Sequence, residues 1–197
     1  QIDHWVLSSV CKQIQHWREM GYPPLRVAVN LSLQTFKKNK VTDMIHRILR
    51  ETGLNANQLE IEMTESWMMR CPEQTVRSLI QLRDMGICLA LDDFGGGYSS
   101  LNYLKQLPVD VLKIGQRFIR NILTDRHDQI IVRTIIELAH HFEMKVVAEG
   151  VETPEQLKLL SETNCDYVQG YLINRPLPAS DVEKYFISGT QHFHSLT

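Results

Sequence analysis

Several features are scarce in this sequence, and each absence excludes a class of protein. The 197 residues carry 21 Lys and Arg against 23 Asp and Glu, so no strongly basic balance indicates a nucleic-acid polymer as the partner. No run approaches the roughly 18 apolar residues of a membrane-spanning helix, and no signal-peptide pattern is present. We therefore expect a globular domain without a membrane segment of its own.

Common metal and phosphate motifs are also missing. The four cysteines are scattered without a C-x-x-C pair, which argues against structural zinc and favours a reducing, cytoplasmic compartment. The glycines of residues 95–97 are not followed by the GK[ST] of a Walker phosphate loop. The chain opens inside a helix and without Met, so we expect a piece of a longer protein that could be membrane-anchored upstream.

What the sequence does contain is a regular alternation of β-branched apolar runs with amphipathic helical segments. Strands are predicted near residues 25–32, 59–66, 87–94, 109–115, 144–151 and 165–172. Helices are predicted at the start of the chain and over 41–53, 72–86, 128–142 and 153–164, with a short one near 99–108. Gly53 and Gly86 are expected to stop their helices, and Thr153 before Pro154 to begin one. The alternation predicts one α/β domain with a parallel sheet.

Polar residues stand where the apolar run of each predicted strand ends. They are Asn30, Glu62, Asp92, Lys113, Glu149 and Gln169. One such residue is ordinarily a strand end satisfied by nearby backbone, but six in register suggest the active-site face of a parallel barrel. The carboxylates, with Asp93, would repel one another unless a cation lay between them. Oxygen ligands of this kind suit Mg²⁺ or Mn²⁺.

The motifs VNLS, EMTES, DDFGGGYSS, LKIG, AEGVET and QGYL followed by RPLP, in this order, resemble the EAL-domain family of bacterial cyclic-di-GMP phosphodiesterases. The resemblance covers residues 1–186 and leaves 187–197 as a polar tail. It implies a TIM-like (β/α) barrel that lacks its two N-terminal strands, with six strands in this chain. The implied reaction is hydrolysis of cyclic di-GMP to linear pGpG at a two-metal site of Mg²⁺ or Mn²⁺.

The resemblance also implies a role for each matching residue. Metal ligands would be Asn30, Glu62, Asp92, Asp93 and Glu149. Lys113 would position or activate the attacking water, and Glu65 would anchor the loop that contains Gly95, Gly96 and Gly97. Gln169, Arg175 and Pro176 would contact or support the nucleotide. A homodimer formed near residues 93–103 and an upstream sensory or GGDEF-type domain are further expectations.

Three departures from the family pattern leave two functions open. The Glu-Ala-Leu segment that names the family is absent, Gly115 stands where Asp is usual, and Gly96 stands where Thr is usual. The retained residues favour a phosphodiesterase. Gly115 favours the alternative, a degenerate EAL domain that acts as a non-catalytic receptor or interaction module. If the missing carboxylate limits turnover, Gly115→Asp should raise the hydrolysis rate or the metal affinity. Separately, Gly96 in place of Thr is expected to make the loop over the site looser.

Overall fold

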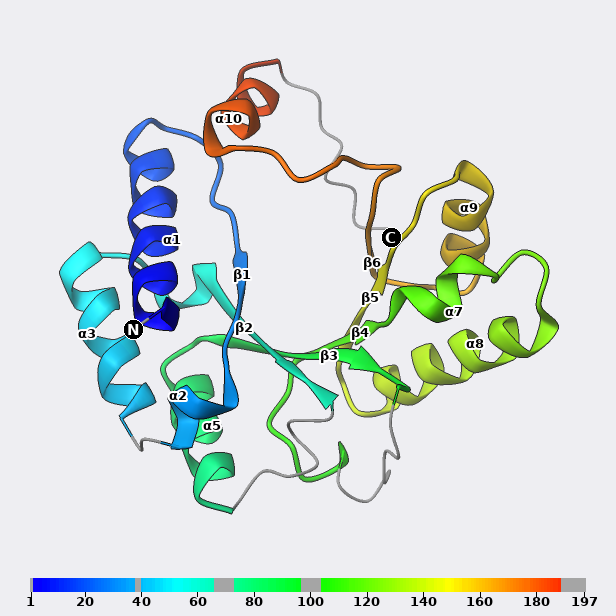
Figure 1. Cartoon of the computed structure of the whole chain (residues 1–197), viewed down its shortest axis with the longest axis horizontal. Coiled ribbons are helices and arrows are strands. Elements are labelled where there is room, and N and C mark those ends of the chain that lie inside the picture. The colour runs from blue at the N-terminus through cyan, green and yellow to red at the C-terminus, as the bar shows by residue number, and fades with distance from the viewer. Residues whose placement is uncertain (1, 38–39, 66–72, 97–103, 189–197) are drawn as a thin grey trace.

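Six parallel strands form one curled sheet in the part of the chain that the computed structural model describes, residues 2–37, 40–65, 73–96 and 104–188 (Figure 1). The strands are β1 (Val27–Asn30), β2 (Leu59–Thr64), β3 (Cys88–Phe94), β4 (Val111–Ile114), β5 (Lys145–Glu149) and β6 (Tyr167–Gln169). Each strand pairs with the next in the sequence, so the spatial order is the chain order. The expected six-stranded α/β half-barrel is confirmed.

Most helices lie on the outer face of the curled sheet, and α10 (Ala179–Ser188) lies at its open side (Figure 1). The others are α1 (Ile2–Glu19), α2 (Leu33–Lys37), α3 (Val41–Thr52), η1 (Ala56–Gln58), α5 (Glu73–Asp84), α7 (Gln116–Arg120), α8 (Arg126–His141) and α9 (Pro154–Glu162). The predicted helix ends are confirmed at Gly53, which caps α3 in the left-handed conformation, and at Thr153, which forms a capping box with Gln156. Most of the short helix expected near 99–108 lies outside the described residues.

Apolar side chains pack on both faces of the sheet. The main core lies between the outer face and the helices, where Ile61, Leu89 and Leu112 are fully buried. A much smaller cluster of Cys88, Ala90 and Val111 lies apart from it, on neighbouring strands of the inner face. Because side chains alternate along a strand, the same strands carry apolar residues outward and the polar residues of the predicted site inward.

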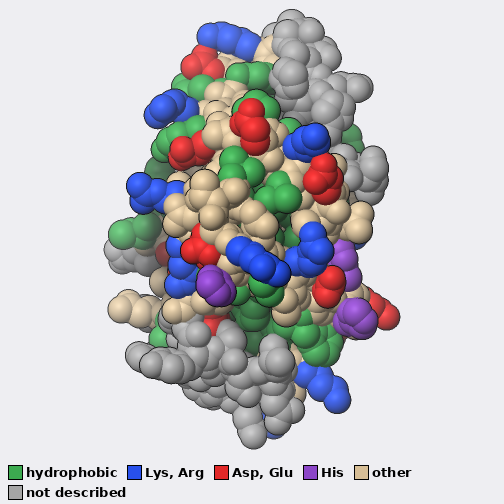
Figure 2. Space-filling model, turned by 90° about the vertical axis from the view of Figure 1, so that its right-hand side faces the viewer, with side chains coloured by type: hydrophobic (Ala, Val, Ile, Leu, Met, Phe, Trp, Pro, Cys, Tyr) green, Lys and Arg blue, Asp and Glu red, His purple; other side chains and the backbone are tan. Residues whose placement is uncertain are grey.

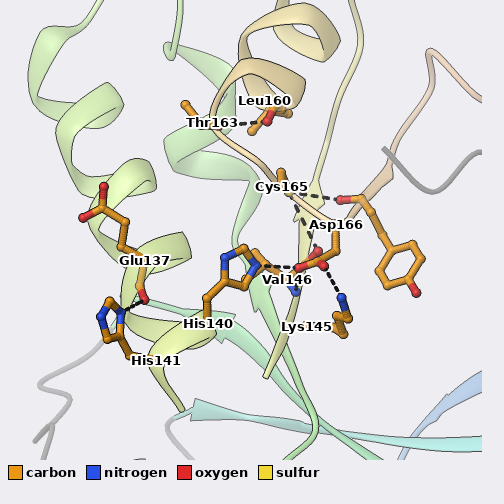
Figure 3. Close-up of polar contacts among 10 residues, drawn as sticks. Glu137, His140, His141, Lys145, Val146, Leu160, Thr163, Cys165 and Asp166 are labelled. Atoms are coloured by element: carbon orange, nitrogen blue, oxygen red, sulfur yellow. Dashed lines mark hydrogen bonds and ion pairs between the residues drawn. The ribbon is translucent and has the colours of Figure 1, made fainter. Parts of the chain in front are cut away.

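Two aspartates fix the N-terminal ends of neighbouring strands in the same way. Asp166, just before β6, accepts the amide N–H of Val146 in β5 at 2.9 Å and contacts Lys145 Nζ at 2.7 Å and His140 Nε2 at 2.8 Å (Figure 3). Asp110, just before β4, accepts the amide N–H of Leu89 in β3 at 3.0 Å. We call these two arrangements the aspartate clamps.

Each clamp also uses a cationic or ring nitrogen from the helix that precedes the strand pair. Arg83 of α5 donates to Asp110 at 2.9 Å, as His140 of α8 contacts Asp166. His140 therefore has a structural partner rather than a metal, and His141 bonds to the backbone carbonyl of Glu137 within its own helix (Figure 3). The clamps join the C-terminal ends of α5 and α8 to the N-terminal ends of the strands. They therefore lie at the opposite end of the strands from the predicted site.

The last described helix, α10, follows β6, one edge strand of the sheet, but lies on the side of α1 and β1, the other edge strand. The chain leaves β6 and crosses to α1, where α10 lies at the top of Figure 1. Trp17 of α1 donates its indole N–H to Glu183 at 2.9 Å, and Phe186 packs edge-on against Trp17 and stacks on Tyr22. The first and last described helices are therefore packed together, although 166 residues separate Trp17 from Glu183.

The outer surface is mixed in character. On the face that forms the right-hand side of Figure 1, Lys and Arg side chains lie among Asp and Glu side chains and scattered hydrophobic ones (Figure 2). This agrees with the near-neutral composition of the chain. None of the described helices is both long and apolar enough to cross a bilayer.

Candidate metal and catalytic site

The predicted site residues lie at the C-terminal ends of their strands. Parallel pairing places Asn30 beside Glu62 on the first two strands, and Glu149 beside Gln169 on the last two. Because all six strands run in the same direction, these ends share one mouth of the half-barrel. The register therefore produces the alignment that the sequence predicted.

Lys113 of β4 lies at the centre of this mouth. Its ammonium is 2.5 Å from Glu62 Oε1, 2.6 Å from Glu149 Oε1 and 3.9 Å from Asp92 Oδ1, and the lysine is only 4 % exposed. Burial alone would lower the pKa of Lys113, but hydrogen bonds to Glu149 and Glu62 outweigh burial and raise it. Lys113 is therefore a fixed cation that joins its own strand, β4, to β2, β3 and β5.

The carboxylates around Lys113 are also constrained. Glu62 is 6 % exposed and accepts a second hydrogen bond, 2.7 Å long, from the side-chain amide of Asn30. Burial raises the pKa of Glu149, and the charges of Asp92 and Glu62 add to this effect, whereas Lys113 lowers it. With Asp93, four carboxylates share a mouth that contains one lysine.

A β-bulge explains how consecutive aspartates can both serve the mouth. The β3–β4 pairing advances from Leu91–Leu112 to Phe94–Ile114, three residues on one strand against two on the other. The extra residue is accommodated at Asp92–Asp93, where Asp93 has a left-handed φ of 53°. Without the bulge, neighbouring side chains would point to opposite faces of the sheet. This irregularity has no signal in the sequence beyond the two carboxylates themselves.

The loop that follows β3 is held from two sides. Glu65, 3 % exposed, accepts the amide N–H groups of Gly95 at 2.8 Å and Gly96 at 3.1 Å. On the other side, the ring of Phe118 lies against Gly95, and the Arg117 guanidinium lies against Gly96 and over the Phe118 ring. The contact of Glu65 with the loop is thus present as expected, whereas no sequence pattern pointed to Arg117. Gly97 lies outside the described residues.

The residues expected to contact the nucleotide lie apart from the cluster of ion pairs around Lys113. Gln169 lies on β6 next to Glu149 in register, but it is exposed. Arg175 follows β6 and places its guanidinium 4.4 Å from the centre of the Tyr171 ring, and Pro176 is exposed beside it. Gln169 therefore lies at the β6 end of the mouth, and none of the three residues takes part in the Lys113 ion pairs.

The donor set at the mouth fits hard divalent cations. All candidate ligands present oxygen, provided that Asn30 turns its amide so that the carbonyl oxygen faces inward. Among the described residues no group of three or more acidic, His or Cys side chains is arranged as a ready coordination site, because Lys113 lies between the carboxylates. The excess of carboxylates over ammonium is the observation that favours added cations.

Comparison with known proteins identifies relatives over nearly the whole chain. The cyclic di-GMP phosphodiesterase NbdA of Pseudomonas aeruginosa is 43% identical over 185 residues, which are 94% of this chain and 24% of that protein. The bifunctional diguanylate cyclase/cyclic di-GMP phosphodiesterase MucR of the same organism is 40% identical over 92% of this chain and 27% of its own length. This chain thus spans about a quarter of the length of these relatives.

Solved structures agree with the sequence relatives. The PaMucR phosphodiesterase in complex with c-di-GMP matches with a TM-score of 0.88 and 40% identity, covering 92% of this chain and 74% of that one. The EAL domain of Mycobacterium smegmatis DcpA matches with a TM-score of 0.91 and 34% identity, covering 95% of this chain and 84% of that one. The family model described as EAL domain matches residues 1–176. This chain belongs to the EAL domain family.

Proposed function

We propose that this chain carries the catalytic mouth of a cyclic di-GMP phosphodiesterase that hydrolyses one phosphodiester to give linear pGpG. The observation that carries the proposal is the cluster of oxygen ligands around Lys113 at the C-terminal ends of parallel strands. The relatives named as cyclic di-GMP phosphodiesterases support the choice of substrate.

Divalent cations are the natural complement of this cluster. We assign them to Asn30, Glu62, Asp92, Asp93 and Glu149, with Mg²⁺ or Mn²⁺ as the ions. When bound, such cations neutralise the carboxylates and make a bound water easier to deprotonate. Two cations would offset the repulsion that a single ammonium leaves.

The residues of the chain supply orientation and charge. In the proposed reaction the oxygen of a water bonds to phosphorus and a carboxylate of the cluster accepts the proton of the water. The bond from phosphorus to the leaving sugar oxygen breaks, and that oxygen takes up the proton to become a hydroxyl group. Lys113 remains protonated, so it orients the water and stabilises negative charge rather than acting as a base. Glu65 keeps the Gly95–Gly96 loop beside the mouth, and Gln169, Arg175 and Pro176 face the nucleotide.

A receptor function is the second candidate. Gly115 provides no carboxylate at the end of β4, and the Lys113 ammonium is already paired with Glu62 and Glu149. A domain of this kind could bind cyclic di-GMP without cleaving it. Binding measured together with turnover separates the two functions.

The test is chromatography of cyclic di-GMP after incubation with the protein and Mg²⁺, Mn²⁺ or Ca²⁺, on this chain and on the intact gene product. We expect pGpG with Mg²⁺ or Mn²⁺ from the intact protein, and loss of product in Glu62→Gln. Glu60→Gln is the matched control, because Glu60 lies two residues earlier on the same strand, where its ion pair is with Arg26 rather than with Lys113. Bound but uncleaved nucleotide in the intact protein would establish the receptor instead.

The parent protein adds further expectations. The greater length of the relatives, and MucR being a bifunctional diguanylate cyclase/cyclic di-GMP phosphodiesterase, support an upstream sensory or GGDEF-type domain. We also propose a homodimer that uses the region after Asp93, much of which lies outside the described residues. Light scattering of the intact protein tests this, and a monomer at high concentration would reject it.

A further inference from the structure

The buried side chain of Gln156 bonds to two separate parts of the chain. Gln156 lies in the first turn of α9 and is 5 % exposed. Its side-chain oxygen accepts the amide N–H groups of Glu152 at 2.8 Å and Thr153 at 3.1 Å. Its side-chain nitrogen donates to the carbonyl oxygen of Ile119 in α7, at 3.0 Å and 37 residues away in the sequence. The side chain therefore joins the start of α9 to the end of α7.

The bond to Ile119 is not needed to cap α9. A capping box requires only an acceptor on the side chain of the third helical residue, and Glu serves there as well as Gln. The negative charge of Glu would even be favourable at a helix N-terminus. The amide nitrogen of Gln156 is the group that Glu lacks. What the amide adds to this cap is therefore the connection to α7.

The two connected segments follow the two members of an ion pair in the mouth. Glu149 is the last residue of β5 and leads into the loop before α9, and α7 begins three residues after Lys113. The pairing of β5 with β4 ends at Ile114 and Ala148, one residue before Glu149. The ladder between these strands thus stops short of the carboxylate that lies 2.6 Å from the Lys113 ammonium.

Hydrogen bonds on both sides of the loop after Glu149 continue where this ladder stops. On the β6 side, the amide N–H of Val151 donates to the carbonyl oxygen of Gln169 at 3.0 Å. On the α7 side, the side chain of Gln156 holds the loop through its bond to Ile119. The position of Glu149 relative to β4 therefore depends on the bond that Gln156 makes.

We propose that Gln156 is a positioning residue for Glu149: by bonding the loop after β5 to α7, it keeps the Glu149 carboxylate against Lys113 in the mouth. The inference rests on the proposed function in one respect, that a displaced Glu149 should slow the hydrolysis of cyclic di-GMP. The contact between Glu149 and Lys113 is a property of the chain itself, so it can be measured without metal or nucleotide.

The test is the rate at which the Lys113 ammonium exchanges protons with water, measured by heteronuclear NMR of the parent chain and its variants. Lys113→Met identifies the signal by its loss. Gln156→Glu keeps the acceptor for the cap but places an oxygen against the Ile119 carbonyl, and Gln156→Met removes the donor without adding a charge. Both Gln156 variants should accelerate the exchange about fivefold, as loss of one ordinary hydrogen bond would.

Thr153→Ala is the control for a general loss of stability. It removes the hydroxyl that caps α9 but leaves the three bonds of the Gln156 side chain in place. Exchange of the Lys113 ammonium should stay close to that of the parent chain. In the intact gene product, kcat for cyclic di-GMP should fall about 10-fold in Gln156→Glu with KM nearly unchanged, because a small displacement of a reacting group slows chemistry strongly. The same kcat should stay near the parent value in Thr153→Ala.

The outcomes separate this inference from the proposed function. Unchanged exchange in both Gln156 variants, equal acceleration in Thr153→Ala, or an undiminished kcat in Gln156→Glu would overturn the inference. A crystal structure of Gln156→Met in which Glu149 keeps its contact with Lys113 would overturn it as well. Accelerated exchange in a protein that binds cyclic di-GMP without cleaving it would support the positioning role and reject the phosphodiesterase. Cleavage by the parent, together with unchanged exchange in the Gln156 variants, would do the reverse.

Discussion

Lys113 is the residue on which the mouth depends most, because its ammonium is buried between two carboxylates. Replacing it with Met would keep the volume and leave Glu62 and Glu149 without their cation. We expect Lys113→Met to lower the free energy of unfolding by about 3 kcal/mol, the usual cost of breaking a buried ion pair. Urea denaturation measures this loss.

Added cations should reverse part of that loss. If the carboxylates bind Mg²⁺ or Mn²⁺, a millimolar concentration of either ion should stabilise Lys113→Met more than the parent protein. Lys158→Met is the control, because Lys158 is exposed and its ion pair with Glu162 is 4.0 Å long. The same deficit with and without the ions would contradict the metal assignment.

Sequence and structure agree on which residues form the mouth but not on how they are joined. Strand-end position alone identified Glu62, Lys113 and Glu149. The ion pairs among them could not be predicted, because Lys113 and Glu62 are 51 residues apart and meet through the inward side of a curled sheet. The direction of Asp93 depends on a bulge in the pairing of β3 with β4, which only the pairing itself reveals.

Among the elements, the loop after β3 has two of its backbone amides bonded to one carboxylate. Glu65→Ala would remove the acceptor for the amides of Gly95 and Gly96. We expect hydrogen exchange at these two amides to accelerate at least 10-fold, because a hydrogen bond to a charged group contributes about 1.5–3 kcal/mol. Mass spectrometry of exchange in peptides that cover 95–96 measures this.

The internal reference for that experiment is the amide of Leu89. Leu89 lies on β3, the strand that leads into the loop, and its amide donates to Asp110. Its exchange should change little, since the clamp lies at the other end of β3. Equal acceleration at both places would mean that the substitution destabilises the whole strand rather than the loop.

The aspartate clamps predict a dependence of stability on pH. Burial alone would raise the pKa of Asp166, but hydrogen bonds from Lys145, His140 and the Val146 amide outweigh burial and lower it below its usual 3.8. A lowered folded-state pKa means that the carboxylate stabilises the fold above pH 3.8, and that this contribution disappears as the pH falls through the folded-state value. The ionised form is the stabilising one.

We expect Asp166→Asn to lower the free energy of unfolding by about 1.5 kcal/mol at pH 7, and by progressively less below about pH 4. Denaturation of the parent and the variant over pH 3–7 gives the difference directly. A difference that stays constant over this range would show that the charge of Asp166 is not what stabilises the clamp.

The short elements also show where sequence patterns stop being informative. Helices α2 and α7 have five residues each, too few to display a helical period, and neither was predicted. Long amphipathic helices such as α3 and α8, and the six strands, followed from periodicity and capping residues. Arg117 and Phe118 belong to α7, so the outer support of the Gly95–Gly96 loop was missed with it.

At the scale of the whole molecule, α10 ties the end of the chain to its beginning. Phe186→Ala would remove the ring that contacts both Trp17 and Tyr22. We expect a loss of about 1–2 kcal/mol in the free energy of unfolding, consistent with two aromatic contacts at a half-buried position. Trp17 should also become more exposed to water, with a red shift of tryptophan fluorescence.

Tyr167→Ala is the control for Phe186→Ala, because Tyr167 is a 43%-exposed aromatic residue on β6 that lies outside these ring contacts. If Phe186→Ala left both stability and fluorescence unchanged, α10 would not be part of the folded unit. We propose that the domain continues through residue 186, ten residues beyond the family match at 176.

The position of the aspartate clamps has a consequence for how such a protein can change over evolutionary time. They hold the strands together at one end, while the residues that choose ligand and reaction occupy the other. Replacements at the mouth, such as the glycines at 96 and 115, can therefore accumulate without loosening the ends that keep the sheet in register. A lineage can pass from hydrolysis to mere recognition, or back, on an unaltered scaffold.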